Sequence, residues 1–293
     1  MVVTIMDGGM GQELVHRSGA TPTGLWSTKI MMDQPELVRS VHDDYFAAGA
    51  KVATVNSYAI QRDRFGPAGI EDRYEELHQL ACEIACRSRD AHGSGIVAGS
   101  LGPLGWSYSH DGAPPAERAA ELYSEICRIQ ADYVDVFLLE TIASLEQAEG
   151  ALAGTLGHGK PVWLAVSVDD SDGTKLRSGE KLSDLRTLAE KTPPQALMLN
   201  CSIPEAVTQG LEIIRGNNLP LGAYANGFSG ISEAFLKKGS TVSSLSARTD
   251  MPPEIYADHA EDWAGLGAEF IGGCCEVGPA HIAEMVRRFK STG

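Results

Sequence analysis

The sequence lacks any apolar run that approaches the roughly 20 residues of a membrane-spanning helix. It is also poor in basic residues, because 24 Lys and Arg stand against 39 Asp and Glu, which gives a formal charge of −15. Nucleic-acid partners require basic patches, so this charge argues against them. The six cysteines have no paired spacing and the first residues show no secretory segment, which suggests a reducing cytoplasm.

The chain does contain a regular alternation of short apolar runs and segments with helical spacing. This alternation is typical of a parallel sheet, and eight strand–helix units close a (β/α)8 TIM barrel. A doubly wound sheet is the alternative, but residues 7–12 do not fit the G-x-G-x-x-G pattern that usually follows its first strand. We therefore predict one α/β barrel domain over residues 1–293. Its predicted strands are residues 2–6, 51–55, 95–99, 134–139, 161–168, 196–200, 219–224 and 268–271.

Polar and reactive side chains stand at or just after the C-terminal ends of these predicted strands. Active sites of TIM barrels lie at that end, so we expect the side chains to face one mouth. They are Asp7, Asn56, Tyr58, Glu140, Cys201, Asn226, Cys274 and Cys275.

Three of these residues are cysteines, and their pattern suggests a metal site. Neighbouring side chains of a strand point to opposite faces, so Cys274 and Cys275 can share a metal only if the backbone turns there. Gly272 and Gly273 permit such a turn. With Cys201 as a third ligand and a fourth position left open, the set is typical of catalytic zinc. The alternative is that these cysteines pack as small buried apolar residues.

Several segments, in order along nearly the whole chain, resemble the homocysteine S-methyltransferase family. They are residues 7–14, 99–103, 140–141, 200–202, 272–275 and 279–282. The resemblance implies a zinc-dependent barrel that transfers a methyl group to the thiol of homocysteine and forms methionine. It also implies that the zinc ligands are Cys201, Cys274 and Cys275, and that the amino acid is held by Asp7, Gly8, Gly9 and Glu140.

Residues 25–29, 34–38, 42–45 and 48–50 resemble the members that use S-methylmethionine or S-adenosylmethionine. Betaine-dependent members share parts of this pattern. The chain departs from the family at Glu276, where a glycine usually follows the cysteine pair, and at Ala225 and Phe228, which flank the asparagine turn. These departures border the expected metal and donor sites. They leave betaine or dimethylsulfoniopropionate open as donor, and another thiol open as acceptor.

The remaining site residues each have a structural alternative. Trp26 and Tyr58 are expected to form an aromatic wall for the cationic donor, or else they only pack. Asn226 is expected to donate a hydrogen bond to a substrate, or else it forms the turn before Gly227. Asp7 could cap its own loop, and Glu140 could form a salt bridge at the barrel mouth.

Two other functions are compatible with a zinc-binding barrel. A hydrolase would use zinc to activate water, but such barrels normally take His and carboxylate ligands rather than three thiolates. A non-enzymatic zinc protein would leave the acids at the strand ends unexplained. Residues 169–181 and 228–253 are long enough to act as lids or as contacts in a homo-oligomer.

Overall fold

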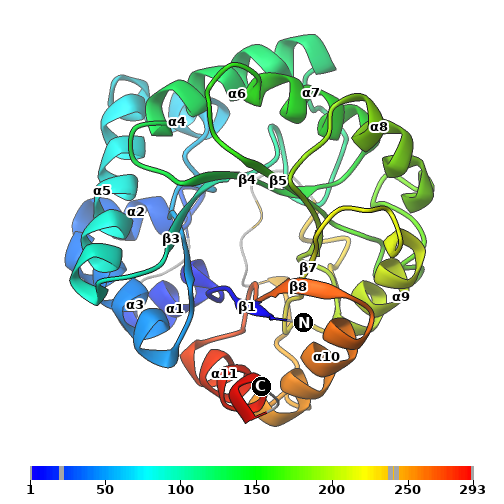
Figure 1. The fold of residues 1–293 in the computed structure, drawn as a ribbon. Coiled ribbons are helices and arrows are strands. Elements are labelled where there is room, and N and C mark those ends of the chain that lie inside the picture. The colour runs from blue at the N-terminus through cyan, green and yellow to red at the C-terminus, as the bar shows by residue number, and fades with distance from the viewer. Residues whose placement is uncertain (1, 20–22, 237–239, 241–243, 292–293) are drawn as a thin grey trace.

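The computed structural model describes residues 2–19, 23–236, 240 and 244–291. Eight parallel strands form a central ring in the order β1-β8-β7-β6-β5-β4-β3-β2, and the helices surround it (Figure 1). The predicted (β/α)8 barrel is confirmed. The strands are β1 (Thr4–Ile5), β2 (Val52–Thr54), β3 (Ile96–Leu101), β4 (Val136–Ile142), β5 (Val162–Val166), β6 (Ala196–Asn200), β7 (Leu221–Tyr224) and β8 (Ala268–Ile271).

Most of the outer helices lie where helical spacing predicts them. They are α3 (Pro35–Ala48), α5 (Tyr74–His92), α6 (Ala116–Gln130), α7 (Leu145–Thr155), α8 (Leu185–Lys191), α9 (Pro204–Ile214), α10 (Pro253–Gly265) and α11 (Pro279–Ser291). Short 3-10 turns, η1 (Glu71–Arg73) and η2 (Leu182–Asp184), precede α5 and α8.

Three further helices occur in stretches that the sequence pattern does not mark as helical: α1 (Met10–Ser18), α2 (Ser27–Asp33) and α4 (Arg62–Ala68). Helix α1 begins at Met10, directly after Gly9 and without a side-chain cap, so the sequence gives no start signal for it. Helix α4 contains Gly66 and Pro67, which lower helical propensity and hide it from a pattern search.

Between β1 and β2 the barrel is closed by one backbone hydrogen bond and by the side chain of Asp7. Among the described residues, no ladder pairs β1 with β2. The backbone N–H of Lys51 donates to the carbonyl of Ile5 at 2.7 Å. Two residues after Ile5, both carboxylate oxygens of Asp7 accept hydrogen bonds from Thr54. The backbone N–H of Thr54 donates at 2.6 Å and its hydroxyl at 2.7 Å. Asp7 therefore closes the seam of the barrel as well as standing at its mouth.

The apolar side chains form three layers. One layer lies between the strands and the surrounding helices and contains most of the buried residues. A second fills the barrel interior, where Trp163, Met198 and Tyr224 are buried. The third is small and consists of Tyr108, Cys201 and Phe235. Because Tyr108 and Cys201 also line the site described below, this third layer lies at the mouth of the barrel.

Helices α6 and α7 pack closely because two glycines of α7 face α6. A Cβ atom at Gly154 would lie 2.5 Å from the Cβ of Tyr123 and 2.7 Å from the carbonyl of Ala120. A Cβ atom at Gly150 would meet the Cβ of Ala119 at 2.7 Å. These two glycines therefore set the distance between the helices on that side of the barrel.

The two long loops singled out in the sequence meet each other over the site. Asp170 of the first loop accepts hydrogen bonds from the backbone N–H of Ile203 at 3.0 Å and of Ile231, in the second, at 2.9 Å. Arg177 forms a bidentate ion pair with the same carboxylate, at 2.8 and 2.9 Å. Part of the second loop, residues 237–239 and 241–243, lies outside the described residues. A role of these loops in oligomer contacts stays a prediction.

Within the described part of the chain, no helix combines the length and the apolar character needed to cross a bilayer.

Candidate active site

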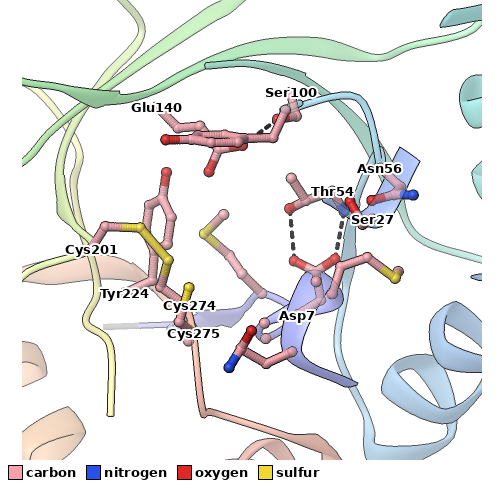
Figure 2. A pocket seen from close by; sticks show the side chains of 18 of the residues that line it. Asp7, Ser27, Thr54, Asn56, Ser100, Glu140, Cys201, Tyr224, Cys274 and Cys275 are labelled. Atoms are coloured by element: carbon pink, nitrogen blue, oxygen red, sulfur yellow. Dashed lines mark hydrogen bonds between the residues drawn. A yellow bond between two sulfur atoms is a disulfide. The ribbon is translucent and has the colours of Figure 1, made fainter. Parts of the chain in front are cut away.

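A pocket with a cavity volume of about 120 Å³ opens at the C-terminal ends of the strands (Figure 2). It brings together residues that are far apart in the sequence, as the barrel predicts. The site residues predicted from the sequence that line it are Asp7, Gly8, Gly9, Trp26, Asn56, Tyr58, Glu140, Cys201, Cys274 and Cys275. Sequence reasoning did not single out Thr54, Ser100, Tyr108 or Tyr224, which also line it.

The three cysteines lie together on one wall of this pocket (Figure 2). Cys201 and Cys274 are joined by a disulfide, with their Cα atoms 5.7 Å apart, and Cys275 is a free thiol. Burial raises the pKa of the Cys275 thiol to about 12, and the neighbouring carboxylates of Glu276 and Glu140 act in the same direction. Without a positive charge nearby, this thiol therefore stays protonated at neutral pH.

The donor atoms of this wall match those of a thiolate metal site only after the disulfide is reduced. Among the described residues, no three Cys, His, Asp or Glu side chains stand in a metal-holding arrangement. In the disulfide, Cys201 and Cys274 are bonded to each other, so neither can act as a thiolate ligand. Reduction yields three thiols on one wall, which is the donor set of a catalytic zinc site with one open position.

The turn after β8 differs from the one expected. Gly272 and Gly273 do not supply left-handed backbone; they are needed because a Cβ atom at Gly272 would lie 2.7 Å from the Cβ of Met6, and one at Gly273 would lie 2.1 Å from Val277. The left-handed residue is Glu276, with φ of 63°. Its carboxylate accepts a hydrogen bond from the side-chain amide of Gln12 at 2.5 Å, which holds this unfavourable conformation in place.

The loop after β1 lies against the same turn. A Cβ atom at Gly9 would lie 2.4 Å from the carbonyl of Cys274, and one at Gly8 would lie 2.1 Å from the carbonyl of Val277. The backbone N–H of Gly9 donates to that carbonyl of Val277 at 2.9 Å. The two glycines thus allow the first and last loops of the barrel to touch beside the cysteines.

Glu140 lies at the end of β4 and is 7% exposed. Burial raises the pKa of its carboxyl to about 7, against the opposing effect of a hydrogen bond from the Ser100 hydroxyl. Among the described residues it has no cationic partner in an ion pair. Its charge is therefore available to a positively charged group that enters the pocket.

Asn200, at the end of β6, ties the Glu140 strand to the cysteine wall. Its side-chain carbonyl accepts from the backbone N–H of Thr141 at 3.0 Å. Its amide nitrogen donates to the Thr141 hydroxyl at 3.1 Å and lies 3.4 Å from Cys201 Sγ. Asn200 is thus a positioning residue that connects Thr141, the neighbour of Glu140, to the sulfur of Cys201.

Asp7 is 4% exposed, and burial raises its pKa to about 6, although the two hydrogen bonds from Thr54 oppose the rise. Its proximity to Glu140 further raises the pKa of the glutamate. The pocket therefore contains two carboxyl groups, and each is costly to ionise in the absence of a positive charge.

Aromatic side chains form another part of the pocket. Trp26 and Tyr58 are stacked, with ring centroids 6.0 Å apart, as the predicted aromatic wall requires. The Tyr58 hydroxyl donates to the hydroxyl of Ser107 at 2.8 Å. Asn226 is not among the pocket-lining residues: it is fully buried and its side-chain carbonyl accepts from the backbone N–H of Phe228 at 3.1 Å. Its amide nitrogen is buried and has no hydrogen-bond partner among the described residues, so the expected hydrogen bond to a substrate stays a prediction beside the turn contact.

Comparison with known proteins now bears on this site. The family model described as homocysteine S-methyltransferase matches residues 4–289. The chain belongs to the homocysteine S-methyltransferase family. It is 29% identical to the homocysteine S-methyltransferase of Escherichia coli, over 98% of this chain and 95% of that protein. It is also 29% identical to homocysteine S-methyltransferase YbgG of Bacillus subtilis, over 98% of this chain and 96% of that one.

Solved structures of this family extend the comparison to the fold. The crystal structure of the E. coli homocysteine methyltransferase MmuM in its metallated form has a TM-score of 0.82 to this chain. The two share 28% identity, over 98% of this chain and 96% of that one. The oxidized form of the same E. coli protein matches equally, also with a TM-score of 0.82. Membership of this family makes the chain a methyltransferase.

Proposed function

We propose that the chain transfers a methyl group from a small sulfonium donor, S-methylmethionine or S-adenosylmethionine, to the thiol of homocysteine, and so forms methionine. The observation that carries this proposal is the meeting of three cysteines and two uncompensated carboxyl groups in one pocket at the barrel mouth. A thiol amino acid has complementary groups, since its sulfur suits the cysteine wall and its ammonium suits the acids.

The acids bind the amino group of the acceptor. Glu140 has a pKa of about 7, so it is partly ionised at neutral pH, and an ammonium beside it favours the ionised form. Both carboxylate oxygens of Asp7 already accept hydrogen bonds from Thr54. An ammonium can therefore bind only to the lone pairs of Asp7 that remain. This division makes Glu140 the main partner of the ammonium and makes Asp7 the residue that places the loop.

The cysteines hold the metal in this proposal. After reduction, zinc is held by Cys201, Cys274 and Cys275. Bound zinc supplies the positive charge that keeps a sulfur ligand deprotonated at neutral pH. A free thiol, with a pKa of about 8.5, is mostly protonated and a weaker nucleophile at that pH. The turn of Gly272 and Gly273 against β1 fixes the direction of the cysteine pair.

The donor requires little proton chemistry from the protein. A methyl group on a sulfonium leaves a neutral thioether behind, so the step needs no general acid. The acceptor loses its thiol proton and the donor loses its positive charge, which balances the reaction. The aromatic residues Tyr58, Tyr108 and Tyr224 surround the cavity and limit the access of water to the methyl group.

The test is a donor panel with zinc-loaded, reduced protein. Homocysteine is incubated separately with S-methylmethionine, S-adenosylmethionine, betaine and dimethylsulfoniopropionate, and methionine is measured. Methionine from S-methylmethionine or S-adenosylmethionine is the expected result. Methionine only from betaine or only from dimethylsulfoniopropionate would show that the proposed donor is wrong. The absence of methionine with every donor, while zinc is bound, would contradict homocysteine as the acceptor.

The ligand set is tested by Cys275→Ser, with Cys127→Ser as the matched control because Cys127 is buried in α6, among the helices outside the barrel. We expect Cys275→Ser to lose tightly bound zinc, measured by metal analysis after dialysis, and methyl transfer together. The control should keep both. Full zinc content and full activity in Cys275→Ser would refute the assignment.

A further inference from the structure

Arg64, on α4, is a buried charge that forms no ion pair with any described residue, although the neighbouring Asp63 carboxylate acts on it from a distance. The residue is 9% exposed, and its Nε and Nη1 atoms find no hydrogen-bond partner in the described part of the chain. Burial lowers the pKa of its guanidinium. Arg62, two residues earlier on the same helix, is the contrast, because it is exposed and paired with Glu125.

The guanidinium lies against two indole rings beside the pocket, behind Trp26, and Arg64 itself is not one of the lining residues. Its central carbon is 4.7 Å from the ring centroid of Trp26 and 5.1 Å from that of Trp106. Trp26 lines the pocket, and its own Nε1 is also buried without an acceptor. Attraction to the rings offsets part of the free-energy cost of burying the charge. It gives none of these N–H groups a hydrogen-bond acceptor. Two adjacent side chains therefore offer donors that nothing in the described chain accepts.

The missing partner must carry negative charge and several acceptor lone pairs. A carboxylate meets both needs, since a guanidinium binds it through parallel hydrogen bonds. A carboxylate beside Trp26 would also lie close to the Arg64 charge, where the low local dielectric keeps the attraction strong. The acceptor and every donor considered above are amino acids or other carboxylates with a positive group elsewhere in the molecule.

We propose that Arg64, with the indole N–H of Trp26, binds the carboxylate of a substrate in this pocket. The inference rests on the proposed function, because it takes its ligand from the same reaction. It assigns complementary charges to the site: Glu140 and Asp7 attract the positive group of a substrate, and Arg64 attracts its carboxylate. The carboxylate belongs either to the methyl donor or to homocysteine, and the experiment separates the two.

This placement also changes the role expected of Trp26. A guanidinium on its ring already uses the negative potential of the aromatic face, so a second cation against the same ring would be repelled. The positively charged centre of the donor therefore lies nearer Tyr58, Tyr108 or Tyr224 than Trp26. Trp26 contacts the carboxylate end.

The experiment compares Arg64→Met and Arg64→Lys with the matched control Arg62→Met. The donor arm uses S-methylmethionine and its carboxylate-free analogue, 3-aminopropyl dimethylsulfonium. The acceptor arm uses homocysteine and 3-aminopropanethiol. For Arg64→Met, we expect kcat/KM to fall about 10- to 100-fold for the carboxylated member of one pair and to change little for its analogue. Arg64→Lys should retain part of this preference, and Arg62→Met should retain all of it.

The arm in which the loss occurs names the source of the carboxylate. A loss that follows the donor assigns it to the donor, and a loss that follows the acceptor assigns it to homocysteine. Equal losses for carboxylated and carboxylate-free compounds in both arms would overturn the proposal, because they would mark Arg64 as a packing residue.

Two measurements do not depend on turnover. Calorimetric titration of S-methylmethionine and, separately, of homocysteine should show at least one of them binding wild type more tightly than Arg64→Met. Equal affinities for both, or no binding of either by wild type, would overturn the site even if methyl transfer is observed. Without ligand, Arg64→Met should melt at or above the wild-type temperature, because it removes an unpaired buried charge. If methyl transfer fails with every donor but carboxylate binding persists, the proposed reaction fails and the binding site stands.

Discussion

Replacing Glu140 by Gln should make the ligand-free protein more stable at alkaline pH while it weakens the binding of homocysteine. The folded protein holds the Glu140 proton with a pKa of about 7, whereas the ordinary value is 4.5. Between these values the folded state binds more protons than the unfolded chain. Stability therefore falls as pH rises from about 4.5 to about 7. Above about pH 7 the folded protein bears the full free-energy cost of ionising Glu140.

The size of the effect follows from the same two pKa values. At 1.36 kcal/mol per pKa unit, they correspond to a cost of at most about 3 kcal/mol for ionising Glu140 in the folded state. Glutamine carries no proton to lose and can still accept the hydrogen bond from Ser100. We therefore expect Glu140→Gln to gain up to about 3 kcal/mol over wild type near pH 8, under about 1 kcal/mol near pH 5 and almost nothing near pH 4.

The assay is chemical denaturation of the ligand-free protein at several pH values, with Glu149→Gln, an exposed acid on α7, as the control. The control should follow wild type at every pH. For Glu140→Gln, the KM for homocysteine near neutral pH should rise about 10-fold or more, because the ammonium loses its charged partner. A Glu140→Gln protein that is less stable than wild type near pH 8, or whose stability difference does not vary with pH, would refute the reasoning.

Three shorter predictions follow from other parts of the molecule. Gly154→Ala should destabilise the protein by about 1–3 kcal/mol in denaturation, because the added methyl group has no room against α6, whereas Gly265→Ala, with nothing within 4 Å, should be near neutral. Asp170→Asn should increase the rate of proteolytic cleavage between residues 228 and 253, because it weakens the ion pair and the backbone contacts that join the two loops. The control Asp172→Asn should not, because among the described residues that carboxylate contacts only Thr174 and Lys175 of its own loop. Titration of thiols in denaturant should find four in the oxidised protein and six after reduction, and methyl transfer should require the reduced form.

The barrel could be predicted because its signal is periodic and local. Apolar runs such as residues 196–200 alternate with segments of helical spacing, and the order of the units follows directly from the chain. Helices α1, α2 and α4 were missed because they lack that signal. Helix α1 follows two glycines, and α4 includes a glycine and a proline, so tertiary packing rather than propensity makes them helical.

The site could be predicted only as far as the strand ends determine it. The rule that active residues stand there placed Asp7, Glu140 and the cysteine wall correctly in one pocket. It could not show that Asp7 binds Thr54, because that contact depends on how β1 and β2 meet. It also placed Asn226 in the pocket, whereas this side chain turns back to its own loop.

The features that sequence patterns could not reveal are the ones that bear most directly on the substrate. Arg64 reads as an ordinary surface arginine on a short polar stretch, and only the folded chain shows it enclosed by Trp26 and Trp106 without a carboxylate. Glu140 is likewise buried, and no cation among the described residues acts on it. Each charge on its own destabilises the fold, and natural proteins keep such charges where function requires them. Substrates that together bring an ammonium and a carboxylate would relieve both costs at once. The ligand-free protein should therefore gain more stability from its carboxylated substrates than from carboxylate-free analogues at equal saturation, because only the former pair with Arg64.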